Sequence, residues 1–153
     1  ACHGTTGLGA PAPGGGTTDY AIDIFHSAVK GERYTCFLEH DEALPMMYMP
    51  DAIRAVLELM AADPSRLTHR NAFNIGAMNF SPAHLAETIR RHIPDFQIDY
   101  EVDPARQAIA DSWPRAVDDS AARREWGWAP RYDLAAMTQD MLATLSTRLK
   151  PAR

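Results

Sequence analysis

A run of three glycines followed by two threonines and an aspartate, at residues 14–19, is the segment of this chain best suited to chemistry. Consecutive glycines let a backbone approach a ligand closely, because no Cβ stands in the way. The N–H groups at a helix start and the hydroxyls of Thr17 and Thr18 can hold an anion, such as a carboxylate or a phosphate. A flexible linker that ends in a capped helix has the same pattern, so spacing alone leaves both interpretations open. The segment is neither a GxGxxG turn nor a P-loop, because the P-loop lysine is absent.

A tryptophan in a proline-flanked loop, Trp113 in Ser112-Trp113-Pro114, is the second candidate. Its indole could wall an apolar pocket or stack on a ring, although core packing is the commoner fate of a single tryptophan. The third candidate is Arg106, which could pair with a carboxylate or a phosphate. We favour the simpler interpretation, in which Arg106 and Asp111 form an exposed ion pair on a helix.

No arrangement of side chains in this sequence predicts a metal site or a nucleophile with its base. The six histidines form no HxxxH or HxH pair, and no Cys–His spacing is typical of zinc. The methionines at positions 46, 47 and 49 are interpreted as core filling. Tyr20 and Lys30 are too far apart to form Tyr-x-x-x-Lys. We therefore expect no metal and no catalytic residue in this chain.

Helices mixed with short strands must position these residues. The apolar spacing and the capping residues predict helices over residues 18–29, 50–63, 82–93, 119–126 and 134–149, and strands over 34–38, 45–49, 72–76 and 96–101. Thr17 or Thr18 is expected to cap the first helix. Ile53, Val56, Leu57 and Met60 form the apolar stripe of the second helix. The pattern predicts an α/β or α+β fold.

The domain organisation changes early in the chain. Residues 1–13 are rich in glycine and proline and have almost nothing to pack, so we interpret them as linker-like or non-native. Residues 14–153 are interpreted as one folded region.

The overall composition excludes several classes of protein. Apolar residues make up 46% of the 153 residues and charged residues 23%, which are ordinary globular values. The net charge is −5 and the charges are scattered, so no surface for nucleic acid or for an anionic membrane is indicated. No apolar stretch approaches the roughly 20 residues of a membrane span. Two cysteines are too few for a disulfide scaffold, which favours a reduced, cytoplasmic setting.

Five stretches of the chain resemble, in order, the C-terminal half of the NAD-dependent L-threonine 3-dehydrogenases. The resemblance is to the short-chain type, which is related to sugar-nucleotide epimerases. The stretches are PGGGTTDYAIDIF (13–25), YTCFL (34–38), LPMMYMPDAIRA (44–55), RQAIADSWP (106–114) and DDSAARREWGWAP (118–130). Some of these would indicate only the extended short-chain superfamily, whereas PGGGTTDYA together with RQAIADSWP is more specific to the threonine enzymes.

The resemblance implies an α/β fold: the C-terminal part of an extended, Rossmann-type short-chain dehydrogenase, with mixed helices and short strands that bind substrate. That family oxidises the 3-hydroxyl of L-threonine, passes a hydride to NAD and forms 2-amino-3-oxobutanoate, a step of threonine catabolism. Its general base is a tyrosine beside a lysine, and NAD lies on a Gly-rich turn. Neither motif is present in this sequence, so the resemblance implies that the NAD-binding half is missing and that the isolated chain is inactive.

The resemblance also suggests which residues bind substrate. Thr18 is expected to hydrogen-bond the amino or carboxylate group of L-threonine, with Thr17 as the second candidate. Gly15 and Gly16 would let the backbone come close to the substrate. Trp113 matches a family tryptophan that closes over the substrate and excludes water.

Structural expectations and two alternatives complete this interpretation. Asp51 and its helix are expected to pack beside the central sheet, and Tyr48 to lie in the core. The helix at 18–29 could contribute to a homodimer. The chain could instead be a fragment of a nucleotide-sugar epimerase or dehydratase, or a non-catalytic interaction module. The short apolar loop at Trp113, with few arginines near it, argues against a large anionic sugar diphosphate.

Overall fold

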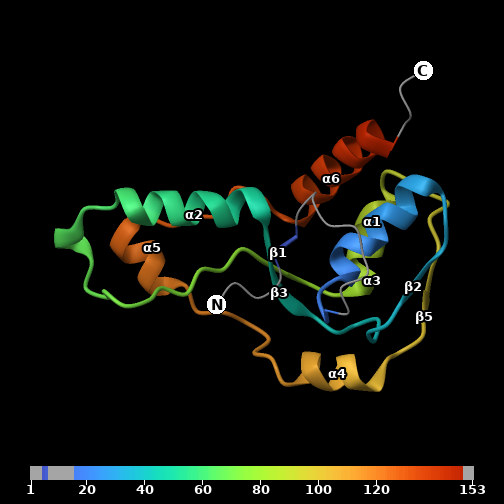
Figure 1. Cartoon of the computed structure of the whole chain (residues 1–153), viewed down its shortest axis with the longest axis horizontal. Helices are drawn as coiled ribbons and strands as arrows, with labels where there is room; N and C mark the ends of the chain where they lie inside the picture. The colour runs from blue at the N-terminus through green and yellow to red at the C-terminus, as the bar shows by residue number, and fades with distance from the viewer. Residues whose placement is uncertain (1–4, 7–15, 150–153) are drawn as a thin grey trace.

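Two small sheets form the strand framework of the molecule (Figure 1). The structure, a computed structural model, describes residues 5–6 and 16–149. The first sheet has the order β1-β3-β4, in which β1 (Thr5–Thr6) runs parallel and β4 (Met78–Phe80) antiparallel to β3 (Leu44–Tyr48). In the second sheet, β2 (Tyr34–Cys36) is parallel to β5 (Ile98–Tyr100).

Helices surround these strands and make up about half of the described chain. They are α1 (Tyr20–Lys30), α2 (Met49–Ala61), α3 (Pro82–Arg90), α4 (Pro104–Asp111), α5 (Ser120–Trp126) and α6 (Leu134–Leu149), with a short 3-10 turn, η1 (Pro64–Arg66). The α/β prediction is therefore confirmed. No helix within residues 16–149 is both long and apolar enough to cross a membrane.

The start of α1 differs from the sequence prediction. Neither threonine caps the helix: the N-cap residue is Asp19, and its side chain makes no capping bond to α1. Its carboxylate accepts instead from the N–H of Gly16, at 2.9 Å, because the chain turns back on itself over residues 16–19. The helix ends at Gly31, whose φ of 71° lies in the left-handed region that favours glycine.

The main core lies where α1, α3 and α6 pack on one another and against the strands (Figure 1). Its largest fully buried side chains include Tyr20, Phe25, Phe80, Leu85 and Met137. Tyr48 belongs to the same core, and its hydroxyl donates to Asp140 Oδ2 of α6 at 2.6 Å.

A second, smaller core holds α2 and α5 together. It consists of Met47, Ala52, Ala55, Ala122 and Trp128, with Phe73, Ile75, Ala77 and Trp126 half-buried against them. The indole N–H of Trp128 donates to the carbonyl of Gly76 at 2.9 Å, so the segment before β4 is tied to this core.

One predicted strand is wrong, and the apolar stripe predicted for the second helix lies on an exposed face. Residues 72–76 run without strand pairing in the described part of the chain, and only Met78–Phe80 pair with β3. In α2, the stripe at residues 53, 56, 57 and 60 is exposed, while Asp51, Ala52 and Ala55 are buried. Within 1–13, interpreted as linker-like, Thr5–Thr6 form β1.

The buried Asp51 carboxylate sets which way α2 faces. Asp51 is 1% exposed and accepts from the backbone N–H groups of Arg131 and Tyr132, at 2.9 and 3.0 Å. It also pairs with Arg54 one turn further along the helix, at 2.9 Å. These bonds compensate the loss of water around the carboxylate, and they join the start of α2 to the chain entering α6.

Replacement of this carboxylate should destabilise the fold strongly. We expect Asp51→Ala to lower the free energy of unfolding by about 3 kcal/mol, since it leaves buried donors unpaired and removes the partner of a partly buried arginine. Urea denaturation followed by circular dichroism measures the change. The exposed Asp41→Ala is the matched control and should unfold like the wild type. An Asp51→Ala curve that overlays the control would contradict this role.

Candidate functional site

The described part of the glycine–threonine segment, residues 16–19, forms a turn directly before α1. Thr17 is buried, and Gly16 and Thr18 are half-buried, whereas Gly15 lies outside the described residues. A Cβ on Gly16 would stand 2.8 Å from Asp19 Oδ1, closer than such atoms approach. A side chain at position 16 would therefore require the Asp19 carboxylate, the end of a flexible side chain, to shift.

Tyr20 fixes this turn against the end of β4. Its hydroxyl donates to the carbonyl of Phe80 at 3.4 Å, and its ring meets the edge of Phe37 with centroids 6.5 Å apart. Burial raises the pKa of Tyr20 above its ordinary value, so the phenol stays neutral and serves as a hydrogen-bond donor rather than a base.

Trp113 lies in the loop that follows α4. Its backbone N–H donates to the carbonyl of Ala110 at 3.0 Å, and its half-buried side chain packs against the main core. Two residues later, the carbonyl of Arg115 accepts from the side-chain amide of Asn79 in β4. The two predicted substrate segments thus attach to adjacent residues of β4, the turn at Phe80 and the Trp113 loop at Asn79.

Gln107 positions α4, and the sequence analysis missed it. Its amide donates to Glu42 Oε2 at 3.0 Å and to Asp111 Oδ1 at 2.8 Å. Its carbonyl accepts from the N–H of Glu39 at 3.0 Å. A glutamine in an amphipathic helix gives no indication in the sequence that it will be buried in a polar network.

The expected pair between Arg106 and Asp111 is wrong. Arg106 stacks over the ring of Phe37, 4.1 Å from its centroid, and its Nε lies 3.6 Å from Asp103 Oδ2. Asp111 accepts a hydrogen bond from the Gln107 amide instead. Arg106 therefore lies on the ring that also contacts Tyr20, so α4 and the start of α1 share a neighbour.

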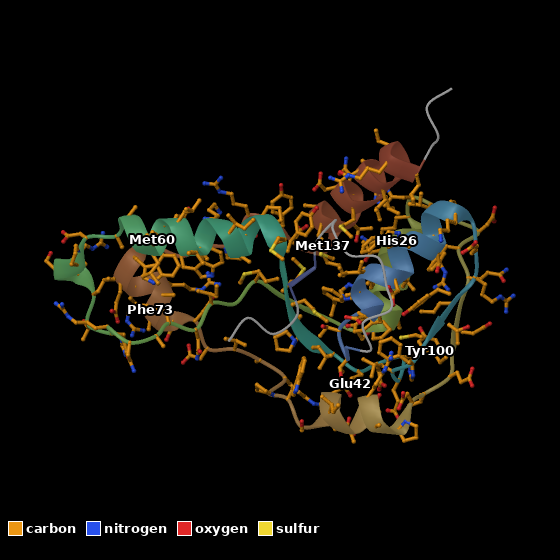
Figure 2. All side chains as sticks on the ribbon, in the orientation of Figure 1. His26, Glu42, Met60, Phe73, Tyr100 and Met137 are labelled. Carbon is orange, nitrogen blue, oxygen red and sulfur yellow. The ribbon has the colours of Figure 1, made fainter. Side chains whose placement is uncertain are left out.

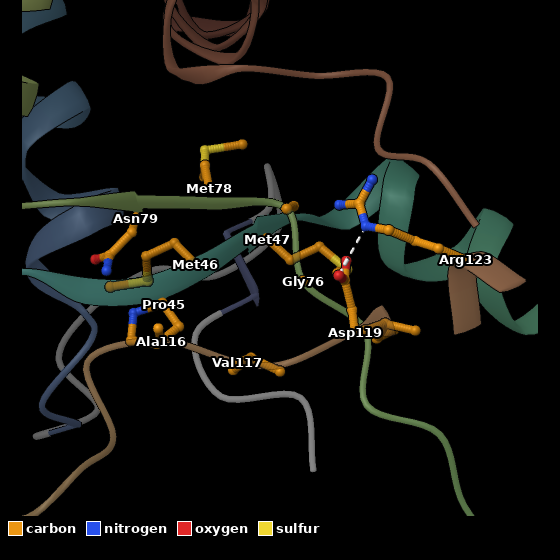
Figure 3. A pocket seen from close by; sticks show the side chains of 12 residues that line it. Pro45, Met46, Met47, Gly76, Met78, Asn79, Ala116, Val117, Asp119 and Arg123 are labelled. Carbon is orange, nitrogen blue, oxygen red and sulfur yellow. Dashed lines mark hydrogen bonds and ion pairs between the residues drawn. The ribbon is translucent and has the colours of Figure 1, made fainter. Parts of the chain in front are cut away.

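A pocket of about 250 Å³ opens beside β3 and β4 (Figure 3). Its lining combines apolar side chains such as Met46 and Val117 with the polar groups of Asn79, Asp119 and Arg123. Asp119 Oδ1 accepts from Arg123 Nε at 2.7 Å. Asn79 both lines the pocket and holds the Trp113 loop, so the pocket borders that loop. Its lining, within the described residues, includes none of the predicted substrate residues.

Tyr48 and Cys36 are two further buried titratable groups, and burial favours the neutral form of each. Burial and the contact with Asp140 raise the pKa of Tyr48, and burial raises the pKa of the Cys36 thiol to about 11. Within residues 16–149, no cluster of three or more histidine, cysteine, aspartate or glutamate side chains could hold a metal. The pocket beside β3 and β4 has the volume to hold a small molecule.

Proteins that resemble this chain in sequence are longer than it is. No protein-family model matches the chain. An uncharacterised epimerase/dehydratase of Staphylococcus haemolyticus is 52% identical over 136 residues, which are 89% of this chain and 43% of that protein. The chain therefore spans less than half the length of this curated relative.

Solved structures share both the sequence and the fold. A GalE-like L-threonine dehydrogenase from Cupriavidus necator is 61% identical, with a TM-score of 0.84 over 88% of this chain and 48% of that one. The L-threonine dehydrogenase of Clostridium difficile is 51% identical, with a TM-score of 0.86 over 90% of this chain and 43% of that one. The resemblance expected from the five sequence stretches is confirmed.

Loss of the Gln107 amide should loosen α4 and the loop that it carries. We expect Gln107→Leu to lower the free energy of unfolding by about 2 kcal/mol, because buried Glu42 loses a donor and a buried amide network is broken. Thermal denaturation measures the effect. Gln97→Leu, at an exposed position, is the control and should change stability little. Equal melting curves for both variants would show that Gln107 does not hold α4.

Proposed function

We propose that this chain, which matches the C-terminal half of the epimerase-like L-threonine 3-dehydrogenases, is the substrate-binding half of such an enzyme. The observation that supports this most directly is the attachment of the glycine–threonine turn and the Trp113 loop to adjacent residues of β4. Both segments belong to the stretches that are most specific to the threonine enzymes. The complete enzyme would convert L-threonine and NAD to 2-amino-3-oxobutanoate, NADH and a proton.

The glycine–threonine turn would hold the charged end of the substrate. Thr18 would hydrogen-bond the amino or carboxylate group of L-threonine, and Thr17 would support it from its buried position. Gly16, and Gly15 before it, would let the backbone come within hydrogen-bonding distance. A hydrogen bond to a charged group is about twice as strong as one between neutral groups, so few contacts suffice for a small amino acid.

Trp113 would close over the substrate and exclude water. Its loop begins at the end of α4, and the hydrogen bonds of Gln107 hold that helix in place, so the position of the indole would be fixed. A bulky ring leaves room for a small amino acid and little for a nucleotide sugar. Exclusion of water strengthens every electrostatic contact inside such a site.

The NAD site does not fit the residues of this chain. The described residues contain no Gly-rich turn between a strand and a helix, and the sequence has no Tyr-x-x-x-Lys. NAD would therefore be held by the other half of the complete enzyme, together with the general base. A cytoplasmic location and a homodimer stay predictions.

The substrate role predicts a specific kinetic effect. In an enzyme assembled from this chain and the N-terminal half of the Cupriavidus necator dehydrogenase, we expect Thr18→Ala and Trp113→Ala each to raise KM for L-threonine about tenfold. That factor corresponds to the loss of one hydrogen bond or one apolar contact to a charged, enclosed substrate. NADH absorbance at varied threonine concentration measures KM.

Two controls accompany this measurement. Ile109→Ala, at an exposed position of α4, should leave KM unchanged. The 153-residue chain alone should produce no NADH above a sample without enzyme. Unchanged kinetics in both site variants would remove the assignments of Thr18 and Trp113.

Ligand protection separates the dehydrogenase from a nucleotide-sugar epimerase, the alternative to which the Staphylococcus haemolyticus relative's name points. A ligand that binds only the folded state raises the melting temperature, by an amount that grows with the logarithm of one plus the ratio of free ligand concentration to Kd. We expect L-threonine to raise the melting temperature of the assembled enzyme and a UDP-sugar to leave it unchanged. Protection by the UDP-sugar alone would favour the epimerase, and protection by neither ligand would favour a non-catalytic interaction module.

A further inference from the structure

Arg106 has two partners at the start of α4. Its guanidinium carbon lies 4.1 Å from the centroid of the Phe37 ring. Its Nε lies 3.6 Å from Oδ2 of Asp103, the residue that caps α4 through the N–H groups of Ala105 and Arg106. Only 29% of the Arg106 side chain is exposed, and partial removal from water strengthens the attraction between a cation and an aromatic face. The guanidinium is therefore held in place by a ring and a carboxylate.

Phe37 connects this contact to the glycine–threonine turn. Its carbonyl accepts from the N–H of Asp103 at 2.9 Å, so both its backbone and its ring hold the start of α4. The rings of Phe37 and Tyr20 meet edge to face at 80°, with centroids 6.5 Å apart. Tyr20 is fully buried and begins α1 directly after the turn at residues 16–19. The turn and α4 are thus joined through one aromatic ring.

Arg106 also acts on the first turn of α1 through its charge. Burial and the nearby Asp19 carboxylate raise the pKa of Asp23, whereas His26 and Arg106 lower it. Asp19 is the residue whose carboxylate accepts from the N–H of Gly16 within the turn. The positive charge of Arg106 therefore favours the ionised form of a side chain one helical turn beyond Asp19, in addition to the packing contacts.

The other end of α4 carries Trp113. The helix spans Pro104–Asp111, and the Trp113 N–H donates to the carbonyl of Ala110 in its last turn, at 3.0 Å. Gln107 joins the helix to Glu42, which lies beside α4 in Figure 2. An α-helix rises about 1.5 Å per residue and bends little over two turns, so the position of its first turn sets that of the loop after its last.

We propose that Arg106 is a positioning residue for the L-threonine site: through Phe37 and Tyr20 it sets the distance between the loop after α4 and the glycine–threonine turn. The inference rests on the proposed function for the identity of the ligand, whereas the positioning itself involves only contacts within this chain. Loss of the guanidinium would free the first turn of α4 and move the indole of Trp113 relative to Thr18.

A direct contact between Arg106 and the substrate carboxylate is the alternative role. An arginine that binds a carboxylate presents its N–H groups to it as a planar fork. Here the guanidinium is drawn to the ring of Phe37 and to Asp103, a carboxylate of its own helix. A substrate contact would make the effect of removing Arg106 independent of Phe37, whereas positioning makes the two effects depend on one contact. Combining the two substitutions separates these roles.

A double-mutant cycle measures this dependence. The enzyme is assembled from this chain and the N-terminal half of the Cupriavidus necator dehydrogenase, and its variants are Arg106→Met, Phe37→Leu and the two combined. Both substitutions keep an apolar side chain while removing the cation or the ring. The matched control is Arg33→Met, because Arg33 also pairs with a carboxylate, that of Asp99 at 2.7 Å, but precedes β2 rather than belonging to α4.

We expect each single variant to raise KM for L-threonine about fivefold, the loss expected for one partly buried cation–π contact, and to leave KM for NAD unchanged. The double variant should raise KM for L-threonine no further than either single variant, since both remove the same contact. Arg33→Met should match the wild type. Multiplied effects in the double variant, or an equal rise in KM for NAD, would overturn the proposal.

Fluorine NMR gives a second readout that needs no activity. The chain has three tryptophans, so in the 153-residue chain labelled with 5-fluorotryptophan the signal of Trp113 is identified by its absence in Trp113→Phe. We expect Arg106→Met to shift that signal and to leave the signals of Trp126 and Trp128, which lie at the smaller core, in place. Arg33→Met should move none of them. A Trp113 signal that Arg106→Met leaves unmoved would overturn the proposal. A shifted signal, together with an assembled wild-type enzyme that does not oxidise L-threonine, would support the positioning of the loop and refute the proposed function.

Discussion

The buried carboxylate of Asp51 is the interaction on which the arrangement of the molecule depends. It accepts hydrogen bonds from the backbone at Arg131 and Tyr132 and pairs with Arg54, so the β3–α2 junction is tied to the chain that enters α6. The ring of Tyr132 then lies edge-on to Tyr48, 4.9 Å between centroids. A charge cannot stay buried without such partners, and satisfying it forces the polar side of α2 inward.

The molecule has one large core and one small one. The small core lacks large apolar side chains from α2, because the polar side of that helix faces inward. The main core is enclosed by α1, α3 and α6, whereas the smaller core is built around Trp128 and small alanines. The Arg54 guanidinium lies 4.7 Å from the centre of the Trp128 ring, so even this core contains charge. The larger apolar side chains of α2 lie on its exposed face instead.

The sequence predicted the positions of helices and strands better than the burial of their faces. Periodicity and capping residues located α1, α2, α3, α5 and α6, since these are local properties, whereas α4 was not among the predicted helices. The spacing of Ile53 and Leu57 correctly placed them on one apolar face of α2. Whether that face is buried depends on which segments pack against it, and local spacing carries no information about those segments. The strand at 72–76 was wrong for the same reason, because extended backbone becomes a strand only where a partner pairs with it. Gln107 was missed because its burial arises from residues distant in sequence.

The two sides of the molecule differ in how far their contacts are completed by residues of this chain. Gly16 and Trp113 lie on segments that are fixed within the described residues, through Asp19, Tyr20 and β4, so the proposed substrate contacts have their own scaffold. The α2 side is less complete, because apolar side chains of α2 are exposed and residues 72–77 pair with no strand in the described chain, although Trp128 bonds the carbonyl of Gly76. The described residues therefore fix the segments that carry the proposed substrate contacts and leave the large apolar side chains of α2 exposed.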